Sequence, residues 1–232
     1  MSNLISVFGK KVAIVTAHPD DESFVFAGLA RGLVVEGAVV DLYCMTMGEQ
    51  GRAYIEITEQ GLKELRSSEL EAAVQIIGMN LVYLGSFPDG SLYKKKQELS
   101  EKLRSLLIGY QSIIGFGSEG FTGHSDHVTM NEVAKVLADE MEIPYYCACL
   151  PHGENHDIIK SALLRKRHCD FYEDCEELDL PEITIKIDSE IKLKALKAHT
   201  SQFSGLDPYG LFDRSTADDF LNFEYYCKNA NK

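Results

Sequence analysis

Short apolar runs alternate along this chain with longer stretches in which apolar side chains recur at helical spacing. The runs predict buried strands at Lys11–Ala17, Val39–Met45, Leu81–Leu84, Ser112–Phe116 and Tyr145–Leu150. The helical spacing predicts helices at Ser23–Glu36, Thr58–Ile77, Ser100–Tyr110, Asp126–Glu140 and Ser189–His199. Strands that alternate with helices in this way indicate an α/β fold, in which a mostly parallel sheet is flanked by helices.

The pattern becomes less regular in the C-terminal third, after Pro151. The acidic segment Cys169–Glu177 is typical of a surface connection, and Ile183–Ile187 alternates like an edge strand. The chain contains no internal repeat and no low-complexity linker. Its length suits one sizeable domain, so we expect residues 1–232 to form a single domain with a less regular last third.

Two polar clusters stand next to predicted strands. Ala17-His18-Pro19-Asp20-Asp21-Glu22 directly follows the first strand, and Gly123-His124-Ser125-Asp126-His127 lies between the fourth strand and the helix after it. The two imidazoles of the second cluster are spaced i, i+3 and share one face if the helix starts there. Because the carboxyl ends of parallel strands border the crevice where ligands bind, we expect the two clusters to meet.

These clusters contain the residue types of a catalytic zinc site. His18, Asp21 and His127 would supply three ligands and leave the fourth position to water, which marks a catalytic rather than a structural site. Zinc lowers the pKa of bound water from about 15.7 to about 7. Asp20 is then available as general base, and His124 as a proton donor or oxyanion stabiliser. This combination predicts a hydrolase for an amide or ester.

Simpler interpretations exist for several of these residues. Asp20 and Asp21 could cap the following helix, and a single buried histidine is more often a core or cap residue than a ligand. The presence of two clusters at two strand ends favours the metal site. Glu22 is expected to cap the helix or to support the ligands. The position of His199 at the end of a helix, where a positive charge is favourable, indicates a structural role.

Charge and composition exclude some classes of partner. The formal net charge of −13 disfavours nucleic acids and anionic membranes. No apolar run reaches membrane length and the first residues lack a basic region before an apolar core, so we expect neither a membrane span nor a secretory leader. None of the six cysteines forms a C-x-x-C pair, so we expect reduced thiols and a cytoplasmic location.

Gly115–Gly120 formally fits the dinucleotide-binding pattern G-x-G-x-x-G, but Glu119 would face the pyrophosphate. A metal-free nucleotide-binding module is therefore a weaker alternative.

Taken together, the motifs resemble those of the PIG-L/LmbE-like zinc-dependent N-deacetylases. The resemblance covers most of the chain, in order and in spacing, although the last third is only partly covered. Ser125 stands where the family usually has proline, which affects loop rigidity but no ligand. The similar segments are the two clusters, Thr46–Gly51, Glu64–Leu70, Pro88-Asp89-Gly90 and Lys194–Gln202.

The resemblance implies a Rossmann-like fold and removal of an N-acetyl group from an N-acetylglucosamine conjugate. It assigns zinc to the same three ligands, Asp20 as the base and His124 as the acid or electrostatic stabiliser. It also implies that Arg66 and Asp89 bind the sugar or its aglycone. The implied partner is a small sugar conjugate, and related proteins often form trimers or hexamers. A related amidase that cleaves a thiol–sugar conjugate is the near alternative, and a zinc-binding protein without activity is disfavoured because Asp20 and His124 are both present.

Overall fold

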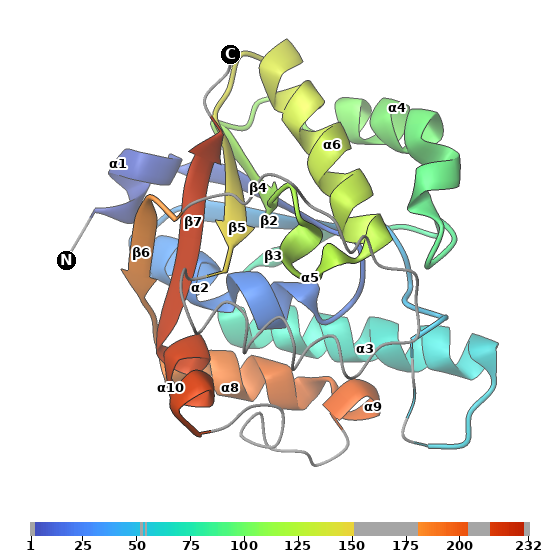
Figure 1. Ribbon diagram of the computed structural model, residues 1–232. Helices are drawn as coiled ribbons and strands as arrows, with labels where there is room; N and C mark the ends of the chain where they lie inside the picture. The colour runs from blue at the N-terminus through green and yellow to red at the C-terminus, as the bar shows by residue number, and fades with distance from the viewer. Residues whose placement is uncertain (1–2, 52, 54, 151–180, 204–213, 230–232) are drawn as a thin grey trace.

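A seven-stranded sheet forms the centre of the protein in this computed structural model, which describes residues 3–51, 53, 55–150, 181–203 and 214–229 (Figure 1). The strand order is β3-β2-β1-β4-β5-β7-β6. The five N-terminal strands pair in parallel and β7 pairs antiparallel with both neighbours, which confirms the mostly parallel sheet. The strands are β1 (Lys11–Thr16), β2 (Val39–Cys44), β3 (Asn80–Leu84), β4 (Ser112–Phe116), β5 (Tyr145–Cys149), β6 (Ile183–Lys186) and β7 (Phe223–Asn229).

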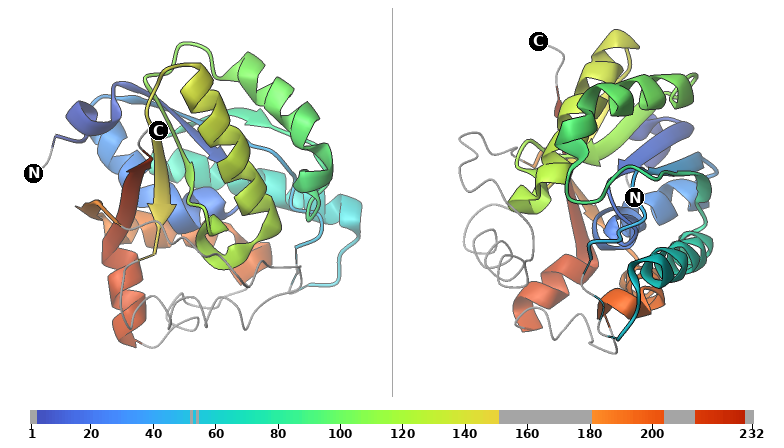
Figure 2. Two further views of the ribbon diagram at one scale, coloured as in Figure 1. Left: turned by 45° about the horizontal axis from the view of Figure 1, so that its top comes forward. Right: turned by 90° about the vertical axis from the view of Figure 1, so that its right-hand side faces the viewer.

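Helices cover both faces of the sheet. α4 and α6 lie over one face, while α2, α3 and α8 lie over the other (Figures 1 and 2). The described helical segments are α1 (Leu4–Phe8), the π-helical turn η1 (Glu22–Phe26), α2 (Ala27–Val35), α3 (Glu59–Ile77), the 3-10 turn η2 (Leu92–Lys95), α4 (Lys96–Leu106), α5 (Gly120–Gly123), α6 (Ser125–Glu140), α8 (Ser189–Ala198), α9 (Thr200–Phe203) and α10 (Arg214–Asn222).

The strand order creates a switch point between β1 and β4. The chain leaves β1 toward β2 on one side and leaves β4 toward β5 on the other, so the loops that follow β1 and β4 diverge. Crevices at such points are the usual ligand sites of open α/β sheets. The first polar cluster follows β1 and the second follows β4, as the sequence predicts.

Two predicted helices differ from the observed ones. The helix predicted at Ser100–Tyr110 is α4 (Lys96–Leu106). It starts earlier because it continues directly from the 3-10 turn η2, and it ends before Gly109, whose φ of 82° lies outside the helical region. The helix predicted from Ser23 begins as the π-helical turn η1 and continues as α2. The segment Cys169–Glu177 lies outside the described residues.

Strand β7 was missed by the sequence analysis, and its buried Glu224 explains why. The carboxylate of Glu224 accepts hydrogen bonds from the backbone N–H groups of Gly28 (2.9 Å) and Leu29 (2.8 Å) at the start of α2. It also pairs with Lys192 of α8 at 3.1 Å, and burial lowers the pKa of this lysine against the pull of the carboxylate. The acidic residue therefore satisfies helix donors that would otherwise lack partners.

Glu224→Ala is expected to destabilise the fold by about 3–5 kcal/mol, because it leaves the buried Lys192 ammonium without its carboxylate. Urea denaturation followed by circular dichroism measures this free energy. The matched control is Glu190→Ala, which removes an exposed i, i+4 pair with Lys194 and should change stability by less than about 1 kcal/mol. Equal, small effects of both substitutions would contradict this assignment.

Candidate metal centre and catalytic site

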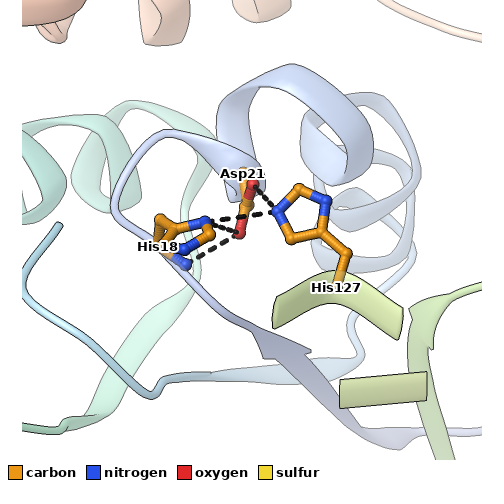
Figure 3. Close-up of side chains that lie close together, drawn as sticks. All are labelled: His18, Asp21 and His127. Atoms are coloured by element: carbon orange, nitrogen blue, oxygen red, sulfur yellow. Dashed lines mark hydrogen bonds and ion pairs between the residues drawn. The ribbon is translucent and has the colours of Figure 1, made fainter. Parts of the chain in front are cut away.

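Three predicted ligands meet at the switch point. Figure 3 shows His18, Asp21 and His127 pointing toward one another. The His127 Nε2 atom lies 3.1 Å from Asp21 Oδ1 and 3.2 Å from His18 Nδ1, and His18 Nδ1 lies 3.6 Å from Asp21 Oδ2. All three residues are buried. The two clusters, more than a hundred residues apart in sequence, thus meet as the sequence predicts.

Hydrogen bonds on the far sides of the two rings fix which nitrogen faces the centre. His127 Nδ1 lies 3.0 Å from the carbonyl oxygen of Gly120, an acceptor only, so Nδ1 carries the hydrogen and Nε2 presents a lone pair. His18 Nε2 lies 3.0 Å from Asp89 Oδ1 and 3.2 Å from Asp126 Oδ2, so Nε2 carries a hydrogen and Nδ1 is the nitrogen that can face a metal. Metal-binding histidines typically have such partners on their second nitrogen.

The third donor, Asp21, does not cap the helix that follows it. Its side chain makes no capping hydrogen bond there, and its Oδ2 accepts from the backbone N–H groups of Ala17 (3.1 Å) and His18 (2.8 Å) instead. Burial alone would raise the pKa of Asp21, but the imidazoles of His127 and His18 hold it well below its usual value. Asp21 is therefore an ionised carboxylate that faces His127 Nε2 and His18 Nδ1.

This donor set suits a divalent cation. Two imidazole nitrogens and a carboxylate present electron pairs to one point, an arrangement that is repulsive until a positive charge lies between them. Burial would lower the pKa of His18, but the carboxylates of Asp89 and Asp126 raise it well above its ordinary value, so the surroundings favour positive charge here. Nitrogen and oxygen ligands of this number are those of catalytic zinc.

Asp126 is a site residue to which the sequence analysis gave no role. Its carboxylate is completely buried, with Oδ2 accepting from the N–H of Gly90 (2.7 Å) and Oδ1 from the N–H of Leu92 (2.9 Å). Oδ2 also contacts His18 Nε2. Asp126 therefore orients a ligand ring and anchors the turn after β3; its place between the two histidines of the second cluster was the available signal.

Asp20 has an unusual backbone and a buried cationic partner. Its φ of 111° lies in the region that favours glycine. The guanidinium of Arg66 on α3 contacts Asp20 Oδ2 at 3.0 Å, donates to the carbonyl of Gly48 (2.7 Å) and also bonds the carbonyl of Pro19. Burial raises the pKa of Asp20 to about 6 despite the opposing charge of Arg66. Such a carboxyl group is suited to accept a proton near neutral pH.

His124 lies beside the ligand rings and presents a hydrogen-bond donor. It caps α6, because its Nδ1 accepts the backbone N–H of Asp126 at 3.1 Å, which leaves the hydrogen of the neutral ring on Nε2. Its ring centroid lies 4.7 Å from that of His18 and 4.8 Å from that of His127. Burial, together with the charge of His18, lowers the pKa of His124 to about 2, so the ring is neutral.

The two residues assigned to the sugar by resemblance lie beside the candidate ligands and Asp20. Asp89 directs Oδ1 at His18 and accepts the N–H of Gln50 on Oδ2 at 2.8 Å, while Arg66 makes the contacts with Asp20 described above. Both side chains are buried. The structure thus brings all seven predicted site residues into one region, and the contact of these two with a sugar stays a prediction.

Comparison with known proteins agrees with this geometry. Residues 13–138, more than half of the 232-residue chain, match the PIG-L family, described as GlcNAc-PI de-N-acetylase. The chain belongs to the PIG-L family. The matched region contains all the candidate ligands, together with Asp20, Arg66, Asp89 and His124.

Individual relatives align with most of the chain. A 1D-myo-inositol 2-acetamido-2-deoxy-alpha-D-glucopyranoside deacetylase from Corynebacterium glutamicum (strain R) is 26% identical and covers 84% of this chain and 75% of its own. A probable N-acetyl-alpha-D-glucosaminyl L-malate deacetylase 2 from Bacillus anthracis is 28% identical, and the alignment covers 84% of this chain and 82% of the relative. The N,N'-diacetylchitobiose deacetylase from Pyrococcus horikoshii shares the fold, with a TM-score of 0.65, 20% identity and coverage of 98% and 86%.

Proposed function

We propose that this member of the PIG-L family is a zinc-dependent N-deacetylase that removes the acetyl group from an N-acetylglucosamine conjugate. The observation that supports this most strongly is the convergence of His18 Nδ1, Asp21 and His127 Nε2 in a family of de-N-acetylases. The relatives from Corynebacterium glutamicum and Bacillus anthracis are named for conjugates that carry N-acetylglucosamine on inositol and on malate. The sugar is therefore the shared part of the proposed substrate.

The residues beside the proposed ligands divide the steps of amide hydrolysis. When bound, zinc would polarise the acetamide carbonyl and make water more acidic. Asp20 would take the proton of the attacking water as general base. His124, with its hydrogen on Nε2, would donate a hydrogen bond to the developing oxyanion, and the proton that Asp20 has taken from water would pass to the departing amine. Cleavage of the C–N bond yields acetate and a free amino sugar.

The proposed role of Asp89 in sugar binding can be separated from its contacts within the protein. Asp89→Asn is expected to raise KM about tenfold, because a charged hydrogen-bond acceptor for the sugar is lost. Initial rates over a range of substrate concentrations, together with metal analysis, give the measurement. A lowered zinc content, with an unchanged KM once excess zinc is supplied, would show instead that Asp89 serves only His18.

A substrate screen tests the function itself. The purified protein is assayed for amine release from N-acetylglucosamine, its disaccharide, its malate conjugate and its inositol conjugate, beside a thiol–sugar amide. Release from the acetylated substrates supports the proposal, and preference for the thiol–sugar amide supports the related amidase. Absence of bound zinc together with thermal stabilisation by NAD would support the nucleotide-binding alternative. The structure gives Gly115 a different reason to be glycine, because a Cβ atom at this position would lie only 2.7 Å from the Tyr145 hydroxyl oxygen.

The remaining expectations concern location and assembly. Among the described residues, no helix has the length and apolar character needed to cross a bilayer. We propose a cytoplasmic enzyme with a small-molecule partner, in a trimeric or hexameric assembly that light scattering after size-exclusion chromatography can measure.

A further inference from the structure

We propose that Glu22 and His199 are positioning residues that hold Asp20 in its working conformation, and that the segment His199–Ser201 is therefore part of the catalytic apparatus. This inference rests on the proposed function, in which Asp20 is the general base. It gives a role to two residues that the metal centre does not use and to the C-terminal motif that contains His199.

Glu22 joins Asp20 to His199 through its two carboxylate oxygens. Oε2 accepts the backbone N–H of Asp20 at 2.9 Å. Oε1 lies 2.7 Å from His199 Nε2 and accepts the hydroxyl of Ser23 at 2.5 Å. Neither the Glu22 nor the His199 side chain is exposed to solvent. A buried carboxylate is stable only when its oxygens are satisfied, so removal of the histidine donor must disturb Glu22.

The backbone of Asp20 needs this support because of its conformation. A φ of 111° is costly for a residue with a side chain, and such conformations persist only where the surroundings impose them. Here the N–H of Asp20 is held by Glu22, and its carbonyl accepts from the N–H groups of Ser23 (3.0 Å) and Phe24 (2.9 Å). The same conformation separates the Asp20 side chain, on Arg66, from that of Asp21, on the ligand histidines.

Helix α3 holds the two residues that follow His199. The carboxylate of Glu69 on α3 accepts the Thr200 hydroxyl (2.6 Å), the Ser201 backbone N–H (2.7 Å) and the Ser201 hydroxyl (2.6 Å). Arg66, one turn earlier on α3, binds the Asp20 carboxylate directly. One helix thus holds Asp20 twice, through Arg66 on its side chain and through Glu69, His199 and Glu22 on its backbone.

The test compares two substitutions of the histidine. His199→Leu removes the donor to Glu22 and is expected to lower kcat by about 10- to 100-fold, as for a misplaced catalytic group, with KM within about twofold and zinc content unchanged. His199→Gln keeps an N–H donor and should recover most of the lost kcat. Glu22→Gln should resemble His199→Leu, because its amide N–H₂ would face either the Asp20 N–H or the donors of His199 and Ser23.

Two controls separate positioning from general instability. Leu103→Ala removes a buried side chain of α4, on the other face of the sheet, and should lower the melting temperature while leaving kcat unchanged. Lys197→Ala alters an exposed residue of α8 and should change neither quantity. A kcat loss in His199→Leu larger than that in a Leu103→Ala variant of equal melting temperature supports the inference.

A crystal structure of His199→Leu supplies a readout that does not depend on activity. We expect Asp20 to have left its positive φ, with the three ligands in place. Unchanged Asp20 geometry and unchanged kcat would overturn the inference, as would failure of His199→Gln to recover kcat while its melting temperature is normal. An inactive wild-type protein would instead contradict the proposed function, and the Asp20 geometry in the variant would still decide the positioning role.

Discussion

His127→Ala should abolish deacetylation and deprive the protein of its metal. The wild-type Nε2 atom lies within 3.2 Å of both other donors, so its removal leaves one imidazole and one carboxylate, too few for a zinc site. The loss of rate should be at least about 10⁴-fold, because the water then keeps a pKa of about 15.7 instead of about 7. Metal analysis after gel filtration and the rate of amine release measure both effects.

The control for His127→Ala is Val136→Ala, which changes an exposed residue on the same helix and should retain both zinc and activity. A His127→Ala protein that keeps one equivalent of zinc and the wild-type kcat would show that this histidine is not a ligand. A variant that loses activity while it retains zinc would place His127 among the residues that act on the substrate.

Asp20→Asn should leave the metal bound and remove most of the rate. Asparagine is nearly isosteric and keeps an oxygen for the Arg66 guanidinium, but its amide cannot take the proton of the attacking water. General-base catalysis contributes about 10²–10⁴-fold, so kcat should fall by that factor, while KM and zinc content stay close to their wild-type values. Steady-state kinetics and metal analysis of the same preparation provide the comparison.

The control for Asp20→Asn is Glu59→Gln, which neutralises an exposed carboxylate at the start of α3 and should have wild-type kinetics. Full activity in Asp20→Asn would rule out the proposed base. Loss of zinc from this variant would mean that Asp20 helps to bind the metal, and the division of roles between Asp20 and Asp21 would then be wrong.

The sheet and its metal centre could be predicted because each depends on local signals. The five parallel strands are short apolar runs, and the carboxyl ends of neighbouring strands β1 and β4 bring His18 and His127 together. Family resemblance added Arg66 and Asp89, which periodicity alone does not single out. Thr58, the N-cap of α3, and Gly78, which ends it with a left-handed φ of 94°, mark helix boundaries that sequence signals predict well.

The supporting contacts could not be predicted, because they join residues that are far apart in sequence. Asp126 bonds His18 across 108 positions and His199 bonds Glu22 across 177, and nothing in the local sequence of either pair specifies its partner. β7 was missed for the same reason. Its Glu224 is polar in sequence but buried in the fold, where α2 and Lys192 supply its partners.

The most direct test of the central claim is a zinc titration of the metal-free protein. Metal is removed with a chelator, zinc is added back in known fractions of an equivalent, and amine release from the best substrate of the screen is measured at each point. Activity is expected to be absent without metal, to rise linearly to a maximum at one zinc per chain, and not to recover in His127→Ala. Undiminished deacetylation by the metal-free protein would contradict this claim.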